Sequence, residues 1–158
     1  MSSSTDRIVK KTVLHASLER VWNAIAEARQ FGTWFGMDVD GAFSAGATLR
    51  ARISPTKVDA EVAKLQEPHA GTEFTLRVDR VEPMRLFSFY WSRHGEENVA
   101  TLVTFELEAE GAGTKLTIAE SGFDAIPLER RAKQFAGSEA GWEHQLRLIA
   151  KYLALAPK

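Results

Sequence analysis

Alternating apolar and polar residues predict a series of β-strands through the middle of the chain. The alternation runs through residues 72–81, 85–93, 99–109 and 114–121. A period of two residues is typical of strands that bury one face. Residues 7–14 form a further strand candidate, and residues 38–53 form a hairpin that returns through 48–53. Short connections separate these strands, so we expect a sheet of about six strands with antiparallel neighbours.

Apolar residues at helical spacing predict helices on either side of these strands. Two short helices are expected after the first strand, over residues 18–26 behind the N-cap candidate Ser17 and over residues 28–35. A long helix is expected after Pro127, with a potential interruption at Gly137. Its apolar stripe is formed by Trp142, Leu146, Ile149 and Leu153.

The segment 54–71 has the least regular pattern. Pro55 and Pro68 bound it, and a short helix is expected between Asp59 and Leu65. A polar connection of this length inside a compact domain is commonly mobile or functional. We expect this segment to border a ligand site or to be a solvated insert.

The order of these elements predicts an α+β helix-grip fold. A curved antiparallel sheet should wrap around the long C-terminal helix, with the two short helices after the first strand. Residues 1–6 are small and polar, so we expect a flexible tail ahead of a single domain over residues 7–155.

Aromatic side chains concentrate on the strand faces expected to point toward the helix. They either fill the core, as aromatic residues commonly do, or line a cavity between sheet and helix. The predicted cavity residues are Trp22, Trp34, Phe35, Phe74, Phe87, Phe89, Trp91, Phe105, Ile118, Glu120, Phe135, Trp142 and Leu146.

Glu120 is the unexpected member of this set. Leu116 and Ile118 alternate as buried strand residues, and the next position on the same face is Glu120. An ionised carboxylate among apolar groups is costly unless it is paired or hydrogen-bonded.

Three explanations for Glu120 remain open. Its carboxylate pairs with an inward Arg or accepts from a Trp N–H; or a bulge at Ser121–Gly122 turns it to solvent; or it is a polar contact inside a cavity that holds ligand or water. General acid–base work by Glu120 is conceivable, but the sequence identifies no partner for it.

Composition limits the classes of function. The 158 residues contain 20 basic and 21 acidic side chains, a net charge of −1, which predicts no general affinity for nucleic acid. Arg130, Arg131 and Lys133 form a small basic cluster typical of a solvated helix face. No apolar run is long enough to insert into a membrane.

The sequence also gives no sign of a cofactor or a secreted protein. There is no cysteine, and the four histidines do not have metal-pair spacing. The polar N-terminus does not resemble a secretory signal. We therefore expect no metal or cofactor, and a cytoplasmic protein.

Several segments, taken in order, carry a resemblance to a known family. They are ASLERVWNAI (16–25), FGTWFG (31–36), GAFSAGA (41–47), RVEPMRLFSFYW (80–91), TLVTFELE (101–108), GTKLTIAESGF (113–123) and GWEHQLRLIAKYL (141–153). The chain resembles the START-like helix-grip (SRPBCC) superfamily. Within it, the chain is similar to the C-terminal domain of activators of the heat-shock protein 90 ATPase. The resemblance implies a curved sheet that grips the last helix, with a cavity between them.

This resemblance leaves three hypotheses for function. The first is a binding module for a hydrophobic or amphipathic small molecule. The second is a cyclase- or hydrolase-type enzyme that uses the same cavity. The third and weakest is a stress-response protein that engages a chaperone.

Overall fold

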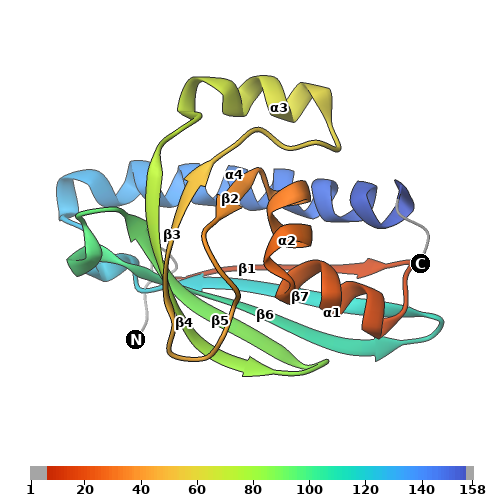
Figure 1. The fold of residues 1–158 in the computed structure, drawn as a ribbon. Coiled ribbons are helices and arrows are strands. Elements are labelled where there is room, and N and C mark those ends of the chain that lie inside the picture. The colour runs from red at the N-terminus through yellow and green to blue at the C-terminus, as the bar shows by residue number, and fades with distance from the viewer. Residues whose placement is uncertain (1–6, 156–158) are drawn as a thin grey trace.

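A computed structural model describes residues 7–155, which form one curved sheet and four α-helices (Figure 1). The strands are β1 (Arg7–Leu14), β2 (Met37–Val39), β3 (Thr48–Ile53), β4 (Glu73–Glu82), β5 (Leu86–Arg93), β6 (Thr101–Glu110) and β7 (Gly113–Ser121). The α-helices are α1 (Leu18–Ala26), α2 (Ala28–Phe35), α3 (Ala60–Gln66) and α4 (Leu128–Leu155). Single 3₁₀ turns are η1 (Glu67–His69), η2 (Glu97–Val99) and η3 (Phe123–Ala125). The tail expected at residues 1–6 lies outside the described residues.

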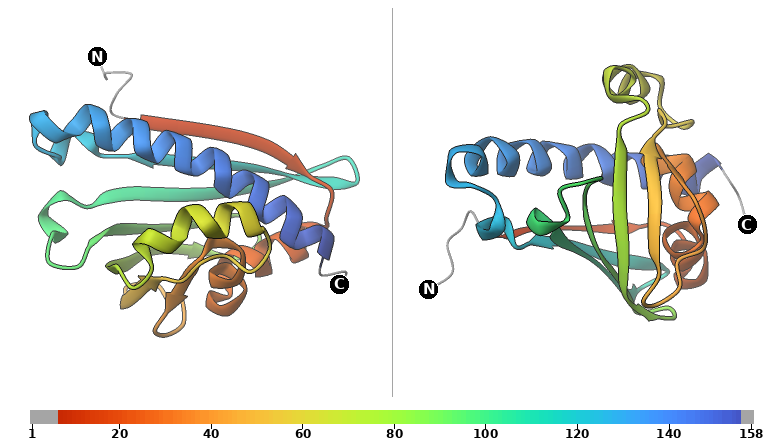
Figure 2. Two further views of the ribbon diagram at one scale, coloured as in Figure 1. Left: turned by 90° about the horizontal axis from the view of Figure 1, so that it is seen from above. Right: turned by 60° about the vertical axis from the view of Figure 1, so that its left-hand side comes forward.

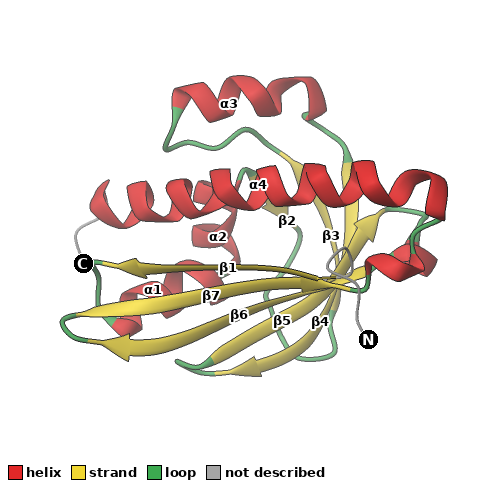
Figure 3. Cartoon of the chain, turned by 180° about the vertical axis from the view of Figure 1, so that it is seen from behind, coloured by secondary structure: helices red, strands yellow, loops and turns green. Residues whose placement is uncertain are grey.

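The seven strands form an antiparallel sheet in the order β1-β7-β6-β5-β4-β3-β2. Strands β2 to β7 follow one another as a meander, while β1 joins the far edge beside β7 (Figure 3). Helices α1 and α2 connect the two edges, and α4 runs along one face of the sheet. The predicted helix-grip fold is confirmed. The seventh strand is β2, the short first arm of the predicted hairpin.

Strand β7 shows how the alternating pattern produces this sheet. Every second residue is buried, from Thr114 through Leu116 and Ile118 to Glu120. The sheet bends further at β4, where the pairing with β5 shifts register between Val78 and Arg80. An extra residue in one strand increases local twist, which helps the sheet curve around the helix.

Helix α2 depends on two glycines for its contact with neighbouring elements. A Cβ on Gly32 would lie 2.2 Å from the carbonyl oxygen of Met37, so only glycine lets β2 approach this closely. Gly36 ends the helix in the left-handed region at φ 92°, as C-terminal glycines commonly do. The amide of Gln66 packs directly against Gly36.

An aromatic cluster fills the space between the early helices and the sheet. Phe31 is fully buried at its centre. Its ring stacks on Phe35 at 4.6 Å and meets Trp34, Phe43, Phe89 and Phe105 edge-on. The Trp34 indole N–H donates to the Ala24 carbonyl at 2.8 Å, so its one polar group is satisfied.

Helix α4 is continuous, and its two halves have different surroundings. The potential interruption at Gly137 does not occur, since the helix runs unbroken from Leu128 to Leu155. None of residues 128–141 is buried, whereas the second half buries Trp142, Gln145, Leu148, Ile149 and Leu153. Seen from above, the N-terminal half of α4 extends away from α3 and the early helices (Figure 2). The helix is therefore buried mainly from Trp142 onward, where it packs on α1 and α2 as well as on the sheet.

Helix α3 is attached to α4 by a buried carboxylate. The Asp59 side chain caps α3 by accepting from the Val62 amide at 3.0 Å. It also lies 2.9 Å from the Lys151 ammonium and 3.0 Å from the Arg147 guanidinium. The pKa of Asp59 is held well below its usual range. The largest cause is the hydrogen bond from the Val62 N–H, and the next is the hydrogen bond from Lys151. Only Val62 of α3 is buried, so α3 is attached mainly by polar contacts: those of Asp59, and the hydrogen bonds of Gln66 with the Thr56 amide and the Phe35 carbonyl.

Within residues 7–155, no helix combines the length and apolar character needed to cross a membrane.

Truncating Trp142 should strongly destabilise the protein. Its side chain is 2% exposed and packs against Phe35, Trp91 and Phe105. Trp142→Ala should lower the free energy of unfolding by about 3–5 kcal/mol, as large aromatic truncations in cores do. Leu128→Ala is the control, because Leu128 is 76% exposed on the same helix. Urea denaturation measures both, and a loss below ~1 kcal/mol for Trp142→Ala would contradict the grip described here.

Asp59→Asn should destabilise the protein at neutral pH but not in acid. Asparagine still caps α3, but it loses the charge that Lys151 and Arg147 contact. A carboxyl with a depressed native pKa stabilises the fold above its unfolded pKa of about 3.9 and loses that contribution as pH falls. The difference in unfolding free energy between wild type and Asp59→Asn should therefore shrink as pH falls from 5 toward about 2.

Urea denaturation at several pH values measures this difference. Glu61→Gln is the control, because Glu61 also contacts Arg147 but is 76% exposed. A difference that stays constant with pH would show that the Asp59 charge does not hold α3.

Candidate functional site

A cavity of about 730 Å³ lies between the N-terminal half of α4, the C-terminal end of α2, α3 and strands β3 to β5. Its lining residues are Phe35, Gly36, Met37, Ile53, Leu65, Gln66, His69, Phe74, Trp91, Arg93, Glu120, Glu129, Arg130, Lys133, Gln134, Gly137, Ser138, Gly141, Trp142 and Gln145. The volume is within the range of small-molecule sites. The residues of α4 that line the cavity ahead of Trp142 are not buried.

Four aromatic rings form the apolar wall of this cavity. Trp91 lies at the centre, with its ring centroid 5.8 Å from both Phe35 and Phe74 and 5.9 Å from Trp142. The Trp91 and Trp142 rings are stacked at 30°, and Phe35 meets both edge-on. These rings come from α2, β4, β5 and α4, so the wall is rigid only when all four elements are in place.

Glu120 joins this wall to the core. Its Oε1 accepts from the Trp142 indole N–H at 2.8 Å, and its Oε2 accepts from the Trp91 indole N–H at 3.0 Å. The Thr101 hydroxyl donates to Oε2 at 2.5 Å. The side chain is 3% exposed, so three donors replace the water that a carboxylate would otherwise bind.

This geometry distinguishes among the explanations for Glu120. The carboxylate accepts from Trp N–H groups, and none of its bonds in the described chain involves an Arg. The bulge explanation is wrong, because Glu120 continues the β7 ladder opposite Ile8 and Val103 and is buried. Glu120 also lines the cavity, so its hydrogen bonds and a place beside a ligand are compatible.

Gln145 contributes a polar atom that has no partner. Its Nε2 donates to the Phe35 carbonyl at 3.2 Å, which fixes the amide orientation. Its Oε1 is buried and has no hydrogen-bond partner among the described residues. The side chain lines the cavity and is 9% exposed. Gln145 therefore combines a place in the cavity lining with a buried acceptor that a donor from a ligand or a water would satisfy.

Helix α4 faces the cavity with small residues. Gly137 and Gly141 are four residues apart and line the cavity together with Ser138. A Cβ at either glycine would meet no atom within 4 Å. Glycine in a helix interior costs about 1 kcal/mol relative to alanine. What these positions provide is open space opposite the aromatic wall.

Basic side chains outnumber acidic ones at the exposed rim. Arg93, Arg130 and Lys133 line the cavity, against the single exposed carboxylate of Glu129. Arg130 lies 3.8 Å from Glu96. A second cavity of about 220 Å³ lies next to the first one. Trp91, Glu120 and Arg130 line both cavities.

The structure places the thirteen predicted cavity residues in two groups. Phe35, Phe74, Trp91, Glu120 and Trp142 line the cavity. Trp22, Trp34, Phe87, Phe89, Phe105 and Ile118 are buried in the core, while Phe135 and Leu146 are partly buried against it. The segment 54–71, expected to border a ligand site or to be a solvated insert, contributes Leu65, Gln66 and His69 to the lining.

The polar and small members of the site were not predicted from the sequence. Gln145 follows Trp142 by three residues, so the helical stripe could have included it. In the sequence pattern, Gly137 indicates only a potential break in the helix. Lys133 and Arg130 were assigned to a solvated face, and they are exposed but also line the cavity.

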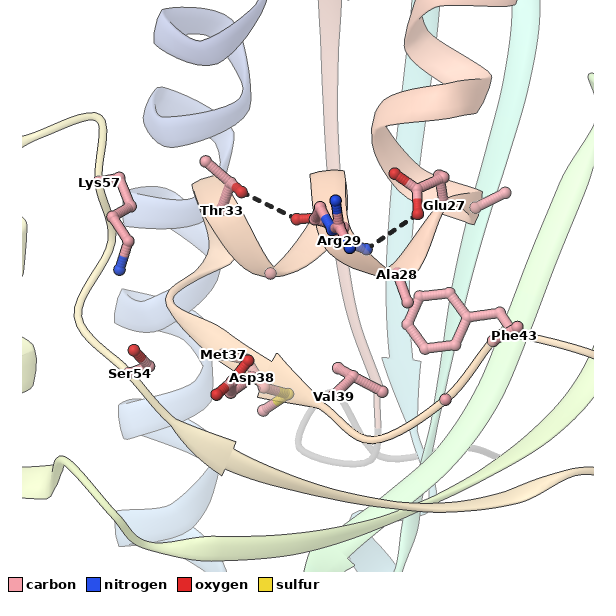
Figure 4. Close-up of a pocket in the computed structure, with 14 residues that line it drawn as sticks. Glu27, Ala28, Arg29, Thr33, Met37, Asp38, Val39, Phe43, Ser54 and Lys57 are labelled. Carbon is pink, nitrogen blue, oxygen red and sulfur yellow. Dashed lines mark hydrogen bonds between the residues drawn. The ribbon is translucent and has the colours of Figure 1, made fainter.

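A separate groove of about 550 Å³ lies beside α2, β2 and the turn after β2 (Figure 4). Its polar groups serve the local fold. Glu27 accepts from the amides of Arg29 and Gln30 at the start of α2, and Asp38 lies 3.7 Å from Arg52. Phe43 is its one aromatic lining residue, so this groove offers less apolar contact than the cavity beneath α4.

Residues 7–155 contain no cluster of three or more His, Asp or Glu side chains suited to hold a metal ion.

Comparisons with solved structures support the fold. The chain is similar to protein MLL2253 from Mesorhizobium loti, at 19% identity and a TM-score of 0.73, over 96% of this chain and 99% of that one. It is similar to DynU16, a putative protein in the dynemicin biosynthetic locus, at 24% identity and a TM-score of 0.70. That match covers 94% of this chain and 47% of DynU16, so this chain spans about half the length of DynU16.

A third similar structure is the Aha1 dimer from Colwellia psychrerythraea. It is 18% identical with a TM-score of 0.66, over 93% of this chain and 94% of that one. A search among curated proteins finds no significant match. Residues 15–154 match the family described as Activator of Hsp90 ATPase homolog 1-like protein. This match extends over nearly the whole described chain, and the chain therefore belongs to that family.

Proposed function

We propose that this protein binds a hydrophobic or amphipathic small molecule in the cavity beneath α4. The observation that carries the proposal is a cavity of about 730 Å³ walled by the rings of Phe35, Phe74, Trp91 and Trp142. The Gln145 side chain, which also lines it, has an acceptor without a partner in the described chain. Aromatic rings around a few fixed polar groups are typical of small-molecule sites. Cysteine is absent from the sequence, which supports a cytoplasmic setting for this function.

The similarity to DynU16 supports a small-molecule role, because that protein is encoded in a biosynthetic locus. No observation favours catalysis over binding. Both oxygens of Glu120 are engaged by donors, so its observed role is to hold Trp91 and Trp142 in place. The family description names a chaperone ATPase activator, and a pull-down with that chaperone would test this third hypothesis.

Filling the cavity from α4 should block binding without unfolding the protein. Gly141→Leu adds a side chain at a helical position that has open space in front of it. It should raise helix stability by about 0.5–1 kcal/mol. Affinity for the fluorescent probe N-phenyl-1-naphthylamine should fall at least about tenfold, because the leucine occupies ligand space.

Fluorescence titration and thermal unfolding measure the two effects of Gly141→Leu. Ala136→Leu is the matched control, since Ala136 is exposed on the same helix and does not line the cavity. Equal loss of affinity in both variants, or no probe binding to the wild type, would contradict the proposal. Native mass spectrometry after mild purification can then identify the natural ligand.

Glu120→Gln should destabilise the protein through the two indoles. Glutamine has one acceptor oxygen, so the N–H of either Trp91 or Trp142 must face its NH₂ group. Hydrogen bonds to charged groups contribute about 1.5–3 kcal/mol, so a loss of this size is expected in urea denaturation.

A double-mutant cycle with Trp142→Phe tests this explanation. Because Trp142→Phe already removes one donor, Glu120→Gln should cost less in that background. Additive losses would show that the Glu120–Trp142 hydrogen bond does not account for the effect.

A further inference from the structure

We propose that the ligand of this cavity carries a hydrogen-bond donor at its inner end and an anionic group at its outer end. This inference rests on the proposed function and specifies its ligand class. The ligand would be an aromatic or alicyclic acid with a hydroxyl or amine group remote from the acid.

The inner end of the cavity presents acceptors. The carboxylate of Glu120 and the Oε1 of Gln145 both belong to side chains that are at least nine-tenths buried. The Gln145 amide cannot easily reverse to offer a donor, because its Nε2 is held by the Phe35 carbonyl, which also accepts from Gln66 at 3.1 Å. A ligand hydroxyl or N–H that reaches Gln145 would satisfy its unpaired Oε1, whereas an anion at this end would lie near that oxygen and the Glu120 carboxylate.

The outer end of the cavity presents cations. Arg93 and Lys133 are exposed at the rim, and neither side chain has a hydrogen bond or ion pair with another described residue. Arg130 adds a third cation, which its distant contact with Glu96 only partly offsets. A guanidinium and an ammonium together suit a carboxylate or sulfonate, and the guanidinium can bind it through two parallel hydrogen bonds.

The two ends therefore impose a direction on the ligand. Acceptors are buried against Trp142 and Phe35, and cations are exposed where α4 begins and β5 ends. The aromatic wall between them holds the apolar body. A ligand with both polar groups at the same end would satisfy only one end of the cavity.

Three related naphthalenes test this inference. The compounds are 2-naphthol, 2-naphthoate and 6-hydroxy-2-naphthoate, which carries its hydroxyl and acid at opposite ends. Each is titrated against wild-type protein loaded with N-phenyl-1-naphthylamine, and displacement of the probe gives its affinity. The hydroxy acid should bind at least about tenfold more tightly than either single-group compound.

Variants assign each preference to its residues. Arg93→Gln with Lys133→Gln should weaken both naphthoates by about tenfold and leave 2-naphthol unchanged. The control is the double variant Arg7→Gln with Lys11→Gln. It removes the same amount of charge from exposed β1 positions that do not line the cavity. Gln145→Met should remove the advantage of the hydroxy acid over 2-naphthoate, and thermal unfolding checks that it remains folded.

The outcomes separate the two proposals. Equal affinity for the three naphthalenes, with the probe bound, overturns the ligand class and leaves the proposed function standing. The same loss of naphthoate affinity in the rim variant and in the Arg7/Lys11 control overturns the assignment to Arg93 and Lys133. Failure of the probe to bind at all overturns the proposed function itself.

Discussion

The buried Glu120 carboxylate is the constraint on which the arrangement of helix and sheet depends. Its three donors come from β5, β6 and α4, while Glu120 itself belongs to β7. Removing a carboxylate from water is costly unless its oxygens are hydrogen-bonded, so the fold is stable only with both indoles in reach. This requirement fixes where α4 crosses the sheet. It also places Trp91 and Trp142 side by side, which creates the aromatic wall of the cavity.

The open space beneath α4 follows from how the two ends of the helix are held. Near the C-terminus, the Arg20 guanidinium donates to the Leu153 carbonyl, and apolar residues pack on the core. Near the N-terminus, Phe135 contacts the buried Phe123 of η3. The helix is thus supported on both sides of the cavity and spans it with glycines. A site whose walls are fixed before binding loses little conformational entropy when a ligand enters.

The sequence predicted the features that depend on local periodicity. The β7 alternation revealed Glu120 as an inward carboxylate, and the apolar stripe located Trp142 on the helix. The sequence offered a Trp N–H as one possible partner of Glu120 but could not say which tryptophans, because Trp91 and Trp142 lie 29 and 22 residues away and meet it only through strand register and helix packing. Gly137 shows the same limit. Glycine lowers helix propensity whether it faces solvent or a cavity. The sequence pattern therefore could not show that Gly137 lies beside a cavity.

The different attachments of α3 and α4 suggest how a cavity with fixed walls can admit a ligand. The C-terminal half of α4 is held by buried apolar packing, whereas α3 buries only Val62 and is tied to α4 by the Asp59 contacts. Elements with few buried apolar contacts open locally at lower free energy than the core. We therefore expect α3 to move before α4 does. Such opening would widen the cavity at the edge lined by Leu65 and Gln66 and leave the hydrogen bonds of Glu120 intact. Entry of the ligand would then depend on the polar contacts of Asp59 near the surface. The packing of α4 on the core would depend on buried contacts that this movement leaves unchanged.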